Sequence, residues 1–141
     1  MSGGNLNNEC FQLAERNSNL ARWLYECERD NYDWVVTILF YSALMYARTW
    51  LELKKLVPPR RHVSYMKSGK ILSKGWDDTI LEEFGNDANI EYSLLYNASR
   101  RCRYDPKEAM NMTKDTTTGY IKSFEKFRTA VVAKLTTLRA L

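Results

Sequence analysis

The only histidine of the chain and the arginines around it are the residues best suited to chemistry. His62 follows Pro58, Pro59, Arg60 and Arg61, directly after a long apolar stretch. An imidazole with an ordinary pKa near 6.5 can act as a general acid or base, and an arginine can hold a phosphate through two parallel hydrogen bonds. This combination favours contact with a phosphate-bearing ligand, or its cleavage. The alternative is a loop histidine that caps the next helix or touches a phosphate without chemistry.

A second group of cations ends another apolar segment, at residues 92–105. Three arginines lie close together there, and two tyrosines precede them at helical spacing. Such cations can bind a phosphate backbone while a tyrosine stacks on a base. Cations at a helix C-terminus also complement the helix dipole without any ligand, and Arg103 could pair with Asp105 or with an acid from residues 76–98. The residues concerned are Tyr92, Tyr96, Arg100, Arg101, Arg103 and Lys107.

The charge of the chain is unevenly distributed. The net charge is only +4, but residues 45–75 contain eight Lys or Arg and one acid, whereas residues 76–98 contain six acids and no Lys or Arg. Such a separation of charge can attract polyanions, and it can also pair two copies of the chain head to tail. For any single residue, a solvated helix face is the simpler explanation.

Length and composition predict a single cytoplasmic domain spanning residues 1–141. The three cysteines (Cys10, Cys27 and Cys102) have no CxxC spacing and one histidine accompanies them, so we expect neither a metal site nor a cofactor. The amino terminus does not resemble a signal peptide. Residues 34–47 lack charge but fall short of the roughly 20 apolar residues that a membrane span needs, which predicts a buried core helix and no membrane partner.

Apolar periodicity predicts four main helices and one or two short ones. The first helix ends near residues 30–31, and the second runs from an Asp33 N-cap to the prolines before Arg60. A short third helix is expected at about 63–72, with further helical turns at 76–83. The fourth covers about 88–103. The last begins at the capping box of Asp105, weakens over 113–119 and resumes at Tyr120.

The same periodicity predicts which faces are buried. The second helix is apolar all round, which places it inside a bundle or at an oligomer interface. The first helix buries a stripe of residues 6, 10, 13, 17, 20, 24 and 27. The fourth helix buries one stripe and displays a second. The buried stripe contains Ile90, Leu94, Leu95, Ala98 and Cys102, and the displayed one contains Tyr92, Tyr96, Ser99 and Arg103.

Three motifs together resemble the HEPN (higher eukaryotes and prokaryotes nucleotide-binding) domain family. Residues 40–47, Phe-Tyr-Ser-Ala-Leu-Met-Tyr-Ala, are similar to the aromatic core of that family's second helix. Residues 57–62, Val-Pro-Pro-Arg-Arg-His, are similar to the loop that follows it. Residues 99–105, Ser-Arg-Arg-Cys-Arg-Tyr-Asp, resemble its arginine-rich helix end. The order and spacing of the motifs fit, and the match covers roughly residues 33–130.

The resemblance implies an all-α fold, an antiparallel up-and-down four-helix bundle with one or two additional short helices, that forms a homodimer. It also implies a role around RNA or nucleotides, and favours ligand binding by Arg103 and Tyr104. Some members are metal-independent ribonucleases of toxin–antitoxin or defence systems, and others are non-catalytic partners of nucleotidyltransferases. The residues expected to bind RNA or a nucleotide are Arg60, Arg61, His62, Tyr96, Arg100, Arg103 and Tyr104.

The chain departs from the ribonuclease members at their catalytic motif. Those members carry an arginine and a histidine separated by four to six residues, whereas Val57, Leu56 and Lys55 occupy the corresponding positions before His62. Met45 stands where many relatives have a histidine. We therefore expect a binding protein without catalysis. The alternatives are a protein-interaction module that partners a nucleotidyltransferase, and an unconventional metal-independent ribonuclease with His62 as its candidate catalyst.

Overall fold

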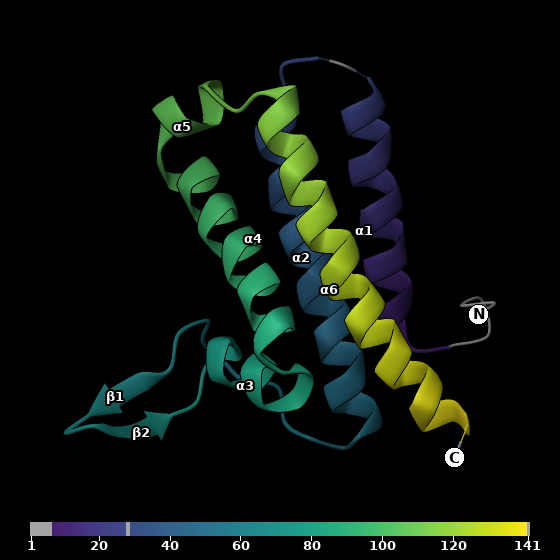
Figure 1. Ribbon diagram of the computed structural model, residues 1–141, viewed down its shortest axis with the longest axis vertical. Coiled ribbons are helices and arrows are strands. Elements are labelled where there is room, and N and C mark those ends of the chain that lie inside the picture. Colours follow the sequence, from purple (N-terminus) through teal and green to yellow (C-terminus); the bar gives the residue numbers. More distant parts are fainter. Residues whose placement is uncertain (1–6, 28, 141) are drawn as a thin grey trace.

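A computed structural model describes residues 7–27 and 29–140 and is mostly helical (Figure 1). In these ranges six helices pack together, and two strands form an antiparallel hairpin beside them. None of the described helices is long and apolar enough to cross a membrane. The elements are α1 (Glu9–Glu26), α2 (Tyr32–Leu53), β1 (Tyr65–Lys67), β2 (Lys70–Ser73), α3 (Trp76–Phe84), α4 (Asn86–Tyr104), α5 (Pro106–Met110) and α6 (Lys114–Ala140).

Helix α2 occupies the centre of the fold, as its apolar circumference predicted. It packs against α1, α4 and α6, and most of its residues are buried. Its start differs from the prediction, because Asn31 and not Asp33 is the N-cap residue, and Asp33 lies in the first turn. An acid there still favours the positive end of the helix dipole.

The predicted buried stripe of α1 is wrong in part. Leu24 packs against the core as expected, but no residue of the stripe that the structure describes is fully buried, and Leu6 lies outside the described residues. The face turned towards α2 contains Phe11, Ala14, Ser18 and Ala21, whereas Leu20 of the predicted stripe is 44% exposed. Small residues decide this orientation because they let the two backbones approach closely. Ser42 Oγ on α2 donates a hydrogen bond of 2.7 Å to the backbone oxygen of Ala14.

The short helix expected at residues 63–72 is also wrong, since strands β1 and β2 occupy this segment. Ser68 and Gly69 join the strands with φ values of 53° and 75°. Two successive residues with positive φ make the kind of turn that matches the twist of a two-stranded hairpin. The helical turns expected at 76–83 are present as α3.

Helix α4 forms where the sequence predicted it, but the face that it buries differs from the predicted one. Leu95, Ala98 and Cys102 are buried as predicted, whereas Ile90 and Leu94 are about half exposed. Two residues of the predicted display face, Tyr92 and Ser99, are instead fully buried. The physical reason is that α4 packs against both α2 and α6, so its aromatic side is needed in the core. The ring of Tyr92 lies 5.8 Å from Phe40 and 6.0 Å from Phe127.

The end of α4 follows the predicted capping chemistry. The Asp105 carboxylate accepts hydrogen bonds from the backbone nitrogens of Lys107 and Glu108, with Pro106 at the first helical position of α5. Helix α5 is only five residues long, and α6 begins at Lys114. The residues at 114–119 are therefore helical, although β-branched residues and a glycine weaken helix propensity there.

A polar network joins α6 to α1 and α2. Arg128 on α6 donates to the hydroxyl of Tyr46 at 2.8 Å and to the carboxylate of Glu15 at 2.7 Å. The network provides the half-buried guanidinium with partners and holds three helices together.

Candidate functional site

The loop between α2 and β1 brings His62 against two helices. Its imidazole lies 5.2 Å from the ring of Tyr96 on α4, at an interplanar angle of 33°, and 5.6 Å from the ring of Phe40 on α2. Its Nδ1 is buried and has no hydrogen-bond partner among the described residues. The ring is therefore held by aromatic packing, and no carboxylate of the described chain orients it as in a hydrolytic triad.

A clamp on α3 fixes the loop that carries His62. The carboxylate of Asp77 accepts hydrogen bonds from both the backbone nitrogen and the hydroxyl of Ser64, at 3.1 and 3.0 Å. The backbone nitrogen of Gly75 donates to the Ser64 hydroxyl at 2.8 Å, and that of Asp77 donates to the backbone oxygen of His62 at 3.1 Å. A Cβ at Gly75 would lie 2.5 Å from the Val63 backbone, so only glycine fits. No local pattern of residues predicted these positions, because the clamp joins segments on either side of the hairpin.

Arg103 lies within electrostatic range of His62 and is the positively charged residue of the site. Its Nη1 donates to the hydroxyl of Tyr41 at 2.9 Å, and its guanidinium lies over the rings of Tyr41 and Tyr104, 5.5 and 5.2 Å from their centroids. Its Nε donates to the backbone oxygen of Ser99. The partner is therefore a tyrosine from α2 and not Asp105, which caps α5.

Burial and the positive charge of Arg103 both lower the pKa of His62 below its usual value. The neutral imidazole is consequently favoured at neutral pH. A neutral imidazole can accept a proton, and the neighbouring guanidinium can bind an anion. We name this group the His62 cluster. It consists of Phe40, Tyr41, His62, Tyr96, Arg103 and Tyr104.

The other residues predicted for the site are only partly brought together. Arg100 is exposed and lines a shallow hollow of about 350 Å³ with Tyr104. Arg101 instead donates to the hydroxyl of Tyr120 on α6 at 3.1 Å, which supports the structural interpretation for that residue. Arg61 lies over the ring of Tyr65 on β1, 5.4 Å from its centroid, and so points towards the hairpin. Arg60 is exposed in the loop.

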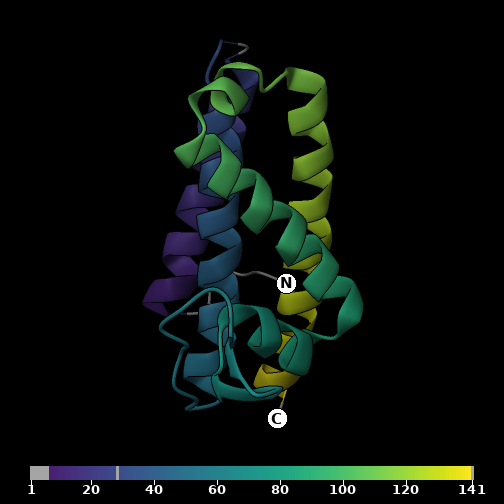
Figure 2. The same ribbon diagram turned by 90° about the vertical axis from the view of Figure 1, so that its left-hand side faces the viewer.

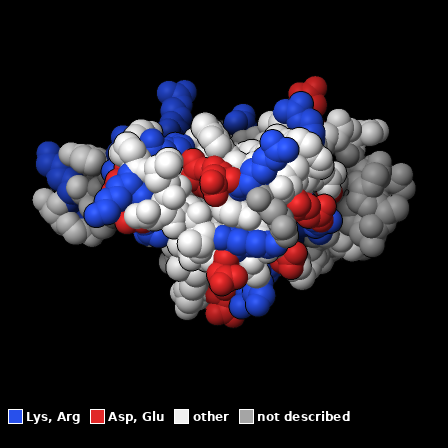
Figure 3. All heavy atoms as spheres, turned by 90° about the horizontal axis from the view of Figure 1, so that it is seen from above, with Lys and Arg blue, Asp and Glu red and all other residues white. Residues whose placement is uncertain are grey.

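The end of the molecule that carries the last turn of α4 has both signs of charge. Seen from above, lysine and arginine side chains are interspersed with acids (Figure 3). Asp105 belongs to the same hollow as Arg100, and Glu108 follows in α5. The cations that the sequence analysis predicted for ligand binding at this end are therefore separate residues among acids and do not form a continuous positive patch.

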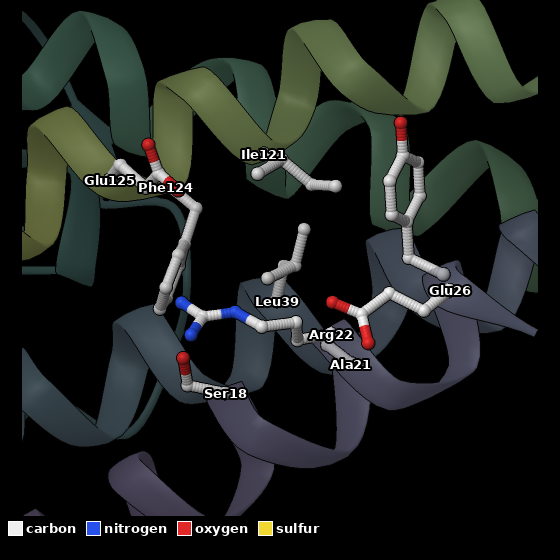
Figure 4. Close-up of a pocket in the computed structure, with 9 residues that line it drawn as sticks. Ser18, Ala21, Arg22, Glu26, Leu39, Ile121, Phe124 and Glu125 are labelled. Atoms are coloured by element: carbon white, nitrogen blue, oxygen red, sulfur yellow. The ribbon is translucent and has the colours of Figure 1, made fainter.

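A second hollow lies between α1 and α6, where Leu39, Ile121 and Phe124 form an apolar floor (Figure 4). Its volume is about 210 Å³, and the side chain of Arg22 lies across it. It shares no residue with the His62 cluster. Among the residues that the structure describes, no three His, Cys, Asp or Glu side chains are grouped so that they could hold a metal ion.

Comparisons with known proteins add no relative. No protein-family model, no curated protein and no solved structure matches this chain. The function is therefore inferred from the His62 cluster and its surroundings.

Proposed function

We propose that this protein is an HEPN-like helical domain that binds RNA or a nucleotide at the His62 cluster without cleaving it. The observation that carries the proposal is the Arg103 guanidinium over the rings of Tyr41 and Tyr104, together with a histidine whose ring packs against that of Tyr96. Tyr104 is the accessible tyrosine of the pair, since it is 73% exposed. Accessible aromatic faces stack on bases, and a guanidinium binds phosphate, which is the combination that single-stranded RNA requires.

The proposal includes the architecture and the compartment. We infer an antiparallel up-and-down four-helix bundle of α1, α2, α4 and α6, with α3 and α5 as the additional short helices in a single domain. The packing of α2 against three helices supports this arrangement. The three cysteines are free in the structure, which supports a reducing cytoplasm.

Cleavage of RNA is the second candidate, and one observation favours it. Arg103 of α4 lies close enough to His62 for its charge to lower the histidine pKa. Arg103 could thus take the role of the arginine that the ribonuclease members carry before their histidine and that this chain lacks before His62. Against cleavage, the described residues provide no hydrogen-bond partner that orients His62 through Nδ1.

Binding and cleavage can be separated in one experiment with single-stranded RNA and a chelator. We expect the unaltered protein to bind RNA, with an affinity that falls as salt rises, and to leave the RNA intact. His62→Ala should then retain most of the binding. Cleavage by the unaltered protein, reduced roughly 10²–10⁴-fold in His62→Ala, would instead make it a metal-independent ribonuclease. If the unaltered protein neither binds nor cleaves RNA, the interpretation as a protein-interaction module for a nucleotidyltransferase in a toxin–antitoxin or defence system replaces both.

We also propose a homodimer, built on a face that α1 and α2 share. Every residue of α2 from 34 to 51 is buried except those at steps of four and three along one stripe, namely Trp34, Ile38, Tyr41, Met45 and Arg48. The adjoining stripe of α1 contains Leu13, Leu20 and Leu24, which are not fully buried. The two stripes lie side by side, as the hydrogen bond from Cys10 Sγ of α1 to the Glu52 carboxylate of α2 shows.

The chemistry of this face favours a second copy of the same chain as its partner. Two antiparallel apolar stripes with heptad spacing match themselves about a two-fold axis. Arg48 and Glu52 already form an ion pair at one end, so a second copy would not have to neutralise either of these charges. Tyr41 belongs both to this face and to the His62 cluster, so that a second copy would lie beside the site.

Replacing Ile38 and Met45 with glutamate should convert the dimer into a monomer, because two carboxylates would be buried without partners. Light scattering during size exclusion at tens of micromolar should report about twice the 16.5 kDa chain mass for the unaltered protein and the single mass for the variant. Ile90→Glu, at a half-exposed apolar site on α4, is the matched control and should remain dimeric. A monomeric unaltered protein would refute the proposal.

A further inference from the structure

The β1–β2 hairpin projects from the helices and is exposed on both faces (Figures 1 and 2). An isolated two-stranded hairpin is at best marginally stable in water. Here the clamp of Ser64, Gly75 and Asp77 holds its base, and the cation–π contact of Arg61 with Tyr65 adds to it. The strands themselves bury nothing in the core. Such an exposed arm contributes little to the fold and needs another explanation.

The two faces of the hairpin differ in chemistry. Met66 pairs with Ile71 and Lys67 pairs with Lys70, so the apolar pair and the two lysines point to opposite faces. The register shift leaves the extra residue on β2, and Tyr65 therefore shares the face of Lys67. One face of the arm is thus basic and aromatic, with Arg61 lying over Tyr65 at its base.

The basic face carries an electrostatic cost that the chain itself does not relieve. Like charges directly opposite each other destabilise a pair of strands. The sequence from 53 to 76 contains seven Lys or Arg and no acid. Lys74 contacts Glu82 on α3, but neither Lys67 nor Lys70 has an ion-pair partner among the described residues. Two lysines opposite each other, with no acid of the chain to neutralise them, point to an external partner of negative charge.

We infer that this basic face, made of Arg61, Tyr65, Lys67 and Lys70, contacts the backbone of the RNA whose base or phosphate is bound at the His62 cluster. The inference rests on the proposed function and deepens it, because the ligand is then a polynucleotide and not a free nucleotide. Arg61 and His62 are consecutive residues, one packed on the hairpin and the other on the helices. An RNA chain that leaves the His62 cluster past Arg61 therefore meets the hairpin. The β-strands of the hairpin lengthen the contact surface by about 13 Å.

The test compares a long and a short ligand in the full chain. Lys67→Gln combined with Lys70→Gln should weaken binding of a single-stranded RNA of about 16 nucleotides. The slope of log K against log salt should become shallower by about 1.4 for the two lost phosphate contacts. Binding of an RNA dinucleotide should not change. Lys122→Gln combined with Lys126→Gln, two exposed lysines on α6, is the charge-matched control and should leave both affinities unchanged.

The outcomes distinguish a failure of the hairpin contact from a failure of the proposed RNA binding at the His62 cluster. If the unaltered protein binds RNA but the hairpin variant binds the long RNA with the same affinity and salt slope, the inference is wrong. The lysines then act only to prevent edge-to-edge pairing of strands. Equal affinity of the unaltered protein for the dinucleotide and the long RNA would also overturn it. If the unaltered protein binds neither RNA, the proposed function fails together with the inference. Thermal unfolding should show the variant at least as stable as the parent, since a repulsion has been removed.

Discussion

Replacing Arg100 and Arg103 with alanine is expected to weaken binding of single-stranded RNA about 10- to 100-fold near physiological salt. The reason is that a hydrogen bond to a charged group contributes about 1.5–3 kcal/mol, and the Arg103 guanidinium is held over the rings of Tyr41 and Tyr104. The slope of log K against log salt should also become shallower by about 1.4, because two fewer phosphates are neutralised. Fluorescence anisotropy titrations at several salt concentrations measure both quantities.

Two further variants make this result specific. Arg16→Ala combined with Arg22→Ala removes the same charge from exposed positions on α1, and should change binding little. Arg103→Lys keeps the charge but loses the planar guanidinium, and should recover only part of the affinity. Equal losses in the α1 variant and the α4 variant would mean that net charge alone attracts RNA, and would contradict a site at Arg103.

Replacing Phe40 with alanine is expected to lower the free energy of unfolding by about 3–5 kcal/mol. Phe40 is fully buried, and its ring lies within 5.8 Å of those of Tyr41, His62, Tyr92 and Tyr96. Its removal leaves a cavity under the His62 cluster that the surrounding rings cannot fill without moving. Urea unfolding followed by circular dichroism measures the loss, which is a large fraction of the stability of a typical domain.

A matched pair of variants separates the stability of the fold from the geometry of the site. Phe124→Ala, buried in α6, should cost a similar free energy without disturbing His62. Phe40→Leu should cost less than about 1.5 kcal/mol and remain folded, yet weaken RNA binding because Phe40 packs against Tyr41, whose hydroxyl holds Arg103. RNA binding by Phe40→Leu that equals the parent would show that packing on Phe40 does not position the site.

Local patterns predicted the helices that a single segment can specify. The uncharged stretch before Ala47 indicated a central helix, and it became the buried helix α2. The Asp105-Pro106 pair predicted a helix start, because capping needs only neighbouring residues, and the Asp105 carboxylate caps α5 as expected. Residue types singled out His62 and Tyr96, and the family resemblance favoured Arg103. The structure places His62 against Tyr96 and within electrostatic range of Arg103.

Apolar periodicity predicted the wrong buried face where either of two faces of a helix could have packed against the core. On α1 the leucine stripe was the more hydrophobic choice, but Ala14 and Ala21 face α2 because close approach of two backbones needs small residues. On α4 the need to fill the space between α2 and α6 buried Tyr92 and left Leu94 outside. Periodicity reports that a helix is amphipathic, and only its neighbours decide which side they cover.

The sequence by itself determined the class of fold and the residue types that can bind an anion. Only the tertiary structure decided that Arg103 pairs with Tyr41, sixty-two positions away, and lies beside His62. It also decided that the Ser64, Gly75 and Asp77 clamp and the projecting hairpin replace a predicted helix. The physical reason is that these contacts join segments distant in sequence. Their geometry is set by how the helices pack, and no local pattern of residues encodes it.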